Sequence, residues 1–252
     1  MIGKPLTDHV RRSFIRIAGG ILTAVTLAAQ PHVVGAQATG SPLKIGIIGA
    51  GREGGALGAL FVKAGHPVTF SSRHPEDLKG LVAGLGPLAQ AGTVEEAIAF
   101  GDVVVIAIPY TAMEQLGQAH AGALAQKVLV IDVSNPIPQR DGADFVKTVN
   151  AQGGAGLMTA KFLPGAHLVR AFNAIGAGKL AELAHRAGDP VGVPIAGDDP
   201  KAIAVAQSLI REIGFEPVLV GGLAMGRHLV PGTPLGGEHT AAQIRQIAGS
   251  LH

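Results

Sequence analysis

Residues 43–55 read L-K-I-G-I-I-G-A-G-R-E-G-G, and this stretch decides the fold. Its first half is an apolar run rich in β-branched residues, which is typical of a buried strand. The second half follows the pattern G-x-G-x-x-G, and apolar residues then recur at helical spacing from Leu57 to Ala64. A strand, a tight glycine turn and an amphipathic helix in this order predict the first half of a dinucleotide-binding βαβ unit.

The three glycines of the pattern each have a physical role in such a unit. Gly49 permits the sharp turn, Gly51 lets the backbone approach a pyrophosphate, and Gly54 lets the helix pack closely on the strand. The pyrophosphate is expected at the N-terminus of the helix, where free N–H groups and the helix dipole favour negative charge. The segment therefore predicts a site for a dinucleotide.

The end of the next strand favours NADP(H) over NAD(H). An NAD site usually has Asp or Glu about 20 residues after the glycines, where the acid binds the ribose 2′-hydroxyl group. Here Ser71, Ser72 and Arg73 follow a strand predicted over residues 67–70. Two hydroxyl groups and a guanidinium group suit a 2′-phosphate, which a carboxylate would repel. The alternative is that these residues form an ordinary polar turn.

Short apolar runs alternate with helical patterns along the rest of the chain. This alternation predicts an α/β fold with a doubly wound parallel sheet of the Rossmann type. Thr93 and Glu96 form a capping box, and Asp199 with Pro200 opens a helix that Gly214 ends. Further strands are expected at residues 89–91, 103–108, 128–133, 168–172, 191–196 and 216–220.

We expect one NADP-binding domain over residues 39–252. Its last part, from about residue 165 to 252, is predicted to be a short α/β extension that forms a small acceptor lobe. The tail from Gly221 onward is rich in glycine, so we expect it to consist mainly of loops.

Polar residues follow three of the predicted strands. The clusters are Ile108-Pro109-Tyr110, Ser134-Asn135-Pro136 and Phe172-Asn173. Ligands of such sheets lie outside the carboxyl ends of the strands, so Tyr110, Asn135 and Asn173 are candidates for orienting a nicotinamide carboxamide and an acceptor ring. The alternative is that these Asn-Pro and Pro-Tyr pairs only form turns.

Composition excludes several classes of function. Hydrophobic residues make up 47% of the 252 residues and charged residues only 15%, which suits a core buried on both faces of a sheet. Trp is absent and Tyr occurs once, so we expect no base-stacking surface for nucleic acid. The chain has no cysteine and its histidines lack metal-ligand spacing, so we expect no bound metal.

The first 38 residues have the pattern of a twin-arginine signal peptide. Arg11 and Arg12 precede an apolar stretch over residues 15–29, and Ala36-Gln37-Ala38 is a predicted cleavage site. We expect a periplasmic protein that begins at Thr39 and has no stable membrane insertion after cleavage. An uncleaved leader or signal anchor is the alternative.

With these residues in place, the chain resembles the coenzyme F420 family, the deazaflavin-dependent NADP oxidoreductases. It is also similar to the dinucleotide domain of the transmembrane ferric reductases. The resemblance covers roughly residues 43–225 and rests on I-I-G-A-G-R-E-G-G, S-S-R, A-I-P-Y, V-R-A-F-N-A-I and the late I-A-G-D-D-P segment. It implies that NADP contacts Ala50, Gly51, Arg52, Glu53, Ser72, Arg73, Ile108, Pro109 and Tyr110.

These observations together predict an NADPH-dependent oxidoreductase. The expected reaction transfers hydride to a flat acceptor such as a deazaflavin (coenzyme F420) or a flavin, with a ferric chelate as a further acceptor through flavin. Such transfer depends on proximity and orientation more than on a side-chain acid. The alternative is a non-catalytic NADP-binding or scaffold protein. We expect a small-molecule redox acceptor as the partner, no nucleic acid, and a homodimer.

Overall fold

The computed structural model describes residues 41–251. The predicted leader, residues 1–38, lies outside the described residues, so the signal peptide and its cleavage site stay predictions. In the described part of the chain, no helix is both long enough and apolar enough to span a bilayer.

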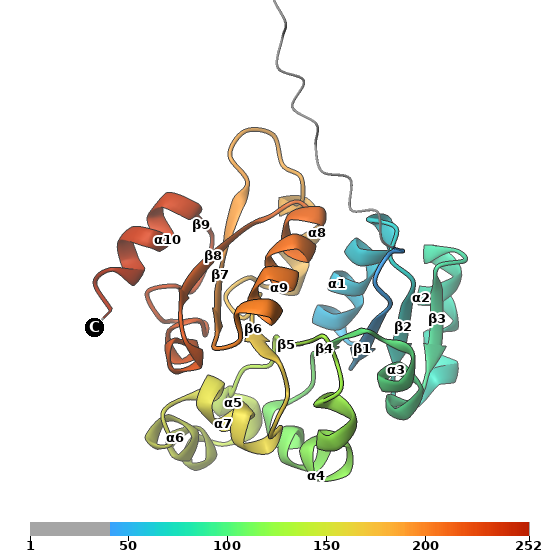
Figure 1. Cartoon of the computed structure of the whole chain (residues 1–252), viewed down its shortest axis with the longest axis horizontal. Helices are drawn as coiled ribbons and strands as arrows, with labels where there is room; N and C mark the ends of the chain where they lie inside the picture. Colours follow the sequence, from blue (N-terminus) through green and yellow to red (C-terminus); the bar gives the residue numbers. More distant parts are fainter. Residues whose placement is uncertain (1–40, 252) are drawn as a thin grey trace, which may run out of the picture. The chain divides into compact units, whose positions relative to one another are not determined.

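Nine strands within residues 41–251 form one sheet, in the order β3-β2-β1-β4-β5-β6-β7-β8, with β9 also paired to β7 (Figure 1). The strands of the first half are β1 (Ile45–Ile48), β2 (Val68–Ser71), β3 (Ala89–Gly92), β4 (Val103–Ile106) and β5 (Leu129–Asp132). Those of the second half are β6 (Leu168–Arg170), β7 (Val191–Gly197), β8 (Glu216–Gly221) and β9 (His239–Thr240). The second half extends the same sheet, as expected for an α/β extension.

The sheet is parallel from β3 to β6, which confirms the doubly wound α/β prediction for this part. Strand β7 is antiparallel to β6, in contrast to the wholly parallel sheet expected from the sequence. The connection between them contains one helix, α8 (Ala177–Leu183). Strand β7 begins on the side of the sheet where β6 ends, and it runs back until Ala196 and Gly197 pair with Arg170 and Val169.

Helices cover both faces of the sheet. One face packs against α1 (Arg52–Lys63), α8 and α9 (Pro200–Glu212), and the other against α3 (Val94–Phe100), α4 (Met113–Leu124) and the end of α7 (Ala155–Phe162). The alternation of strand residues explains this arrangement, because Val103 and Val105 belong to the first core whereas Val104 and Ile106 belong to the second. The remaining helical segments are η1 (Pro75–Leu78), α2 (Lys79–Leu85), η2 (Tyr110–Ala112), α5 (Pro138–Asp141), α6 (Ala143–Ala151), η3 (Leu223–His228) and α10 (Ala241–Ala248).

The predicted helix caps are present. Thr93 and Glu96 form a capping box on α3, and the Asp199 side chain accepts a hydrogen bond from the Lys201 N–H at the start of α9. The tail was expected to be mainly loop, but it also contains β9 and α10. Thr240 caps α10 with Gln243 in a second capping box, a signal that could have been found in the sequence.

Candidate dinucleotide site

The turn between β1 and α1 leaves no room for a side chain at Gly49 or Gly54. Gly49 has a φ of +95°, and a Cβ atom there would lie 2.6 Å from the carbonyl oxygen of Ala107. A Cβ atom at Gly54 would lie 2.1 Å from the carbonyl oxygen of Gly49. These two positions therefore accept only glycine, one for the turn and one for the contact between helix α1 and strand β1.

Gly51 differs from its two neighbours in the motif. A Cβ atom on Gly51 would have no heavy atom within 4 Å, and the residue is exposed. Its backbone φ of −73° is also accessible to other residues. Nothing in the free protein therefore requires glycine here, and the open space in front of this backbone is what a bound pyrophosphate would need.

The N-terminus of α1 has no side-chain cap. Gly51 occupies the N-cap position and supplies no side-chain hydrogen bond, so the N–H groups of the first turn lack intrahelical partners. The preceding backbone is held in place because the Ala50 N–H donates to the Ser71 carbonyl oxygen at 2.9 Å. Helix α1 thus presents unpaired donors and the positive end of its dipole, the combination that binds phosphate groups.

A cleft of about 510 Å³ opens beside this helix end. Several segments distant in the sequence form its walls, including the start of α1, the ends of β4 and β5, helix α5 and the start of α8. The lining residues are Arg52, Glu53, Ala107, Ile108, Pro109, Val133, Ser134, Asn135, Ile137, Arg140, Gly176, Ala177 and Gly178. The structure therefore brings together the predicted residues Arg52, Glu53, Ile108, Pro109 and Asn135, and it adds Arg140 and the residues around Ala177, which the sequence analysis missed.

Glu53 is the unusual group in this cleft. Burial raises the pKa of its carboxyl group to about 7, against smaller lowering effects from a backbone hydrogen bond at Ala177 and the charge of Arg52. Its Oε1 atom is buried and has no hydrogen-bond partner among the described residues. A carboxyl group in this state changes protonation near neutral pH.

The residues predicted to bind a 2′-phosphate are not equally accessible. Ser72 is half-buried and its Oγ accepts a hydrogen bond from the His74 N–H at 3.1 Å, while Arg73 is exposed. Ser71 is the last residue of β2 and is fully buried. Its hydroxyl group is therefore enclosed by the protein, which leaves Ser72 and Arg73 as the accessible pair.

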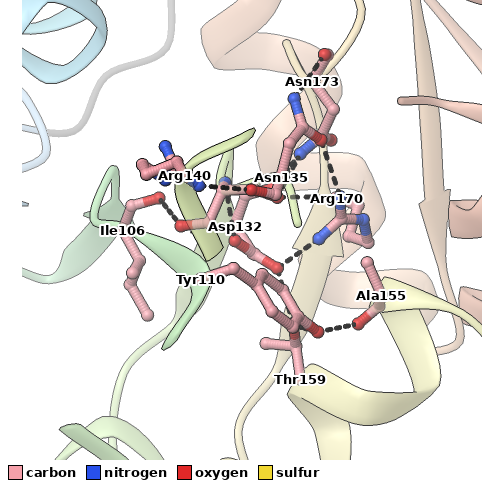
Figure 2. Close-up of polar contacts among 10 residues, drawn as sticks. Ile106, Tyr110, Asp132, Asn135, Arg140, Ala155, Thr159, Arg170 and Asn173 are labelled. Carbon is pink, nitrogen blue, oxygen red and sulfur yellow. Dashed lines mark hydrogen bonds and ion pairs between the residues drawn. The ribbon is translucent and has the colours of Figure 1, made fainter. Parts of the chain in front are cut away.

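Tyr110 is placed differently from the prediction. The side chain is fully buried, and its hydroxyl group donates to the Ala155 carbonyl oxygen at 2.7 Å and lies 2.9 Å from Thr159 Oγ1 (Figure 2). Burial also raises the pKa of this phenol well above its usual range. The hydroxyl group thus links η2 to α7 and does not line the cleft. The sequence around Tyr110 does not show this, because the hydrogen-bond partners lie on α7.

Asp132 and Arg170 form a fully buried ion pair beside the cleft (Figure 2). Asp132 also accepts hydrogen bonds from Thr159 Oγ1 at 2.8 Å and from the Ser134 N–H at 2.8 Å. Arg170 donates to the Ser134 carbonyl oxygen at 2.9 Å and to Asn135 Oδ1 at 3.3 Å. An acidic and a basic residue on strands of otherwise apolar sequence indicate that each charge needs a buried partner, but they do not show that the two residues pair with each other.

Asn173 and Asn135 also belong to this buried cluster. Asn173 Nδ2 donates to the carbonyl oxygens of Asp132 and Ser134, and Asn135 Nδ2 donates to the Asn173 carbonyl oxygen at 2.8 Å. Asn173 is buried and does not line the cleft, so its side chain braces the strand ends instead of orienting a ligand. Asn135 reaches the cleft, yet both of its side-chain polar atoms already have protein partners.

Part of the chain matches a known protein family. Residues 44–136 match the family described as NADP oxidoreductase, coenzyme F420-dependent. The chain is 32% identical over 189 residues to metalloreductase STEAP3 of Rattus norvegicus, a match that covers 74% of this chain and 35% of that protein. The chain therefore spans about a third of the length of this relative.

Solved structures also resemble the fold, two of them as follows. A hypothetical protein from Sinorhizobium meliloti is 27% identical, with a TM-score of 0.64 and coverage of 79% of this chain and 95% of that one. A protein from Arthrobacter sp. FB24, proposed to be an F420-dependent NADP reductase, is 23% identical, with a TM-score of 0.63 and coverage of 73% and 87%. The family resemblance predicted from the sequence is confirmed over residues 44–136, which match the coenzyme F420-dependent NADP oxidoreductase family.

Proposed function

We propose that this protein is an NADP(H)-dependent oxidoreductase that exchanges hydride with a flat redox ring, a deazaflavin or a flavin. The observation that carries the proposal is the cleft at the uncapped end of α1, where Gly51 leaves open space in front of free backbone donors. The family match over residues 44–136 supports the same conclusion.

The residues at the site fit NADP(H). The glycine turn and the first turn of α1 would hold the pyrophosphate, and Ser72 with Arg73 would hold the 2′-phosphate, since β2 ends without an acid. Ile108 and Pro109 line the cleft and offer apolar contacts to a nicotinamide ring. When bound, NADPH supplies the hydride, and the protein supplies orientation and exclusion of water.

The acceptor requires a direct experiment. Purified full-chain protein is incubated with NADPH and, in separate reactions, with coenzyme F420, FMN, FAD or ferric citrate with and without flavin. Loss of NADPH absorbance is followed beside a binding titration, and the Gly51→Val protein serves as the matched control. We expect turnover with a deazaflavin or flavin that the variant loses. Tight NADPH binding without turnover on any acceptor would favour a non-catalytic NADP-binding protein, and an absence of binding would contradict both functions.

We also propose that the protein is exported to the periplasm with its nucleotide already bound. The support is the arginine pair Arg11-Arg12, the apolar stretch after it and the Ala36-Gln37-Ala38 sequence. N-terminal sequencing after cell fractionation tests this, with replacement of both arginines by lysine as the control. A wild-type protein that stays in the cytoplasm with residues 1–38 attached would contradict the proposal.

A further inference from the structure

Glu53 lies where a bound pyrophosphate would be its neighbour. It is the second residue of α1, between Arg52 and Gly54, and its side chain lines the cleft at the uncapped helix end. Its Oε1 atom is buried without a hydrogen-bond partner among residues 41–251, while the backbone at Ala177 contributes a hydrogen bond to the carboxyl group. The free protein thus already encloses one carboxyl oxygen that nothing in the described chain stabilises.

The cations around Glu53 do not neutralise it. No ion pair of the described residues includes this carboxylate. On its own helix, Arg52 is exposed. On α5, Arg140 pairs with Asp141; near the start of α8, Lys179 pairs with Glu182; and on the strands behind the cleft, Arg170 pairs with Asp132. The nearby positive charges of these packed elements are therefore mostly engaged with other acids.

A pyrophosphate at the glycine turn would add negative charge beside this carboxyl group. Like charges at one site disfavour the charged form of an acid, and the partial burial of Glu53 weakens solvent screening of the repulsion. Protonation of Glu53 removes the repulsion and turns the orphaned carboxyl oxygen into a neutral group. It also allows the carboxyl group to donate a hydrogen bond to a phosphate oxygen.

We propose that Glu53 takes up a proton when NADP(H) binds, so that the occupied site contains a neutral carboxyl group in place of a carboxylate. The inference rests on the proposed function, because it requires the pyrophosphate at the glycine turn. Its consequence is that the affinity for NADP(H) depends on pH through one identified side chain.

The direction of the pH dependence follows from the free protein. Burial already raises the pKa of Glu53 to about 7, so well below pH 7 the group is protonated before the ligand arrives and binding takes up no proton. Above pH 7 the free group is a carboxylate and binding takes up close to one proton. The contribution of Glu53 to the affinity is therefore constant in mild acid, and it lowers the affinity by up to about tenfold per pH unit above neutrality.

Calorimetric titration of the full-chain protein with NADP⁺ tests the proposal. Titrations near pH 7.5 in buffers of different ionisation enthalpy give the number of protons taken up per site. We expect about 0.5 to 1 proton for wild type and none for Glu53→Gln, which keeps the shape of the side chain and is neutral at every pH. Glu114→Gln removes an exposed carboxylate from the first turn of α4 and should behave as wild type.

Adenosine 2′-monophosphate separates the two phosphate sites. It carries the 2′-phosphate, which itself titrates near pH 6, but it has no pyrophosphate. We expect it to bind wild type without the proton uptake seen with NADP⁺. This comparison needs no variant, so it remains decisive even where Glu53→Gln folds poorly.

The outcomes are distinct. Binding of NADP⁺ to wild type without proton uptake, or equal uptake by wild type and Glu53→Gln, overturns the role of Glu53 and leaves the proposed function intact. A failure of NADP⁺ to bind at all overturns the proposed function and this inference with it. Uptake by wild type that is lost in Glu53→Gln and absent with adenosine 2′-monophosphate supports the proposal.

Discussion

Two polar regions lie at the carboxyl ends of strands in the same sheet, and they differ in how their hydrogen-bonding groups are used. At the end of β1, the first turn of α1 leaves its N–H donors unpaired and Gly51 faces open space. At the ends of β5 and β6, the Asp132–Arg170 pair is fully enclosed and bonded to Ser134, Asn135 and Thr159. The backbone donors of the first region are free to bind a ligand, whereas the polar groups of the second region bond mainly to one another.

This difference shows that polar residues at a strand end do not by themselves make a ligand site. Asn135 and Asn173 were both candidates on the ground of position, and both use their side-chain amides within the protein. Two polar atoms of the enclosed region, Arg170 Nε and Asn173 Oδ1, have no hydrogen-bond partner among the described residues. Even so, its role is to hold β5, β6 and α7 together beside the cleft.

Loss of the buried ion pair should have the largest effect on stability. Arg170→Ala leaves the Asp132 carboxylate buried without its cation, which should lower the free energy of unfolding by about 3–5 kcal/mol. Chemical denaturation measures the change. The control is Lys179→Ala, which removes an exposed pair with Glu182 and should cost less than about 1 kcal/mol. Similar losses in the two variants would contradict the contrast between the regions.

At the glycine turn, we expect a substitution to weaken NADPH binding strongly and to change stability little. Gly51→Val places a branched side chain in the space expected for the pyrophosphate, so NADPH should bind at least about 100-fold more weakly, or about 2.7 kcal/mol. Stability should change by less than about 1 kcal/mol, because a Cβ atom at Gly51 meets no neighbour. Gly54→Ala is the comparison, since its Cβ atom would strike the Gly49 carbonyl oxygen and should reduce stability and binding together. Undiminished NADPH affinity in folded Gly51→Val protein would remove the case for this site.

Arg73 should decide between the two nucleotides. Arg73→Ala should weaken NADPH binding by about 1.5–3 kcal/mol, the scale of a hydrogen bond to a charged group, and should barely change NADH binding. Titration with both nucleotides measures this. The fully buried Ser71 offers a matched position, because Ser71→Ala should leave the preference for NADPH unchanged. Equal losses of NADPH and NADH affinity in Arg73→Ala would contradict the 2′-phosphate assignment.

Tyr110 provides the smallest and most discriminating test. Tyr110→Phe removes the hydrogen bond to the Ala155 carbonyl oxygen and should lower the free energy of unfolding by about 1–2 kcal/mol. The affinity for NADPH should change by less than about twofold, because the hydroxyl group does not line the cleft. A large loss of affinity without a loss of stability would restore Tyr110 as an orienting residue.

Several parts of the site could be predicted from the sequence because their signals are local. The turn at Gly49, the close packing at Gly54 and the caps at Thr93 and Asp199 each depend on residues only a few positions apart. Ile108 and Pro109, which a local pattern at the end of a strand singled out, line the cleft. Backbone conformation and helix capping are short-range properties, so the sequence pattern is sufficient to recognise them.

Other parts could not be predicted because their partners are distant in the chain. Tyr110 is buried by α7, and Asp132 finds its cation on β6, which the sequence alone does not pair with it. Ser71 is a further case, since the same hydroxyl group would suit a phosphate if it were exposed. Which side of a strand end is enclosed depends on the elements that pack over it.

The sequence by itself determined the α/β architecture, the glycine turn and the family resemblance. Each of these depends on patterns of residues that lie close together in the chain. Only the tertiary structure decided that β7 runs antiparallel to β6, that Tyr110 and Asn173 serve the protein interior, and that Glu53 is enclosed beside Ala177. The physical reason is that burial and the pairing of polar groups are set by contacts between remote segments. Those contacts determine whether a donor or a charge is left for a ligand.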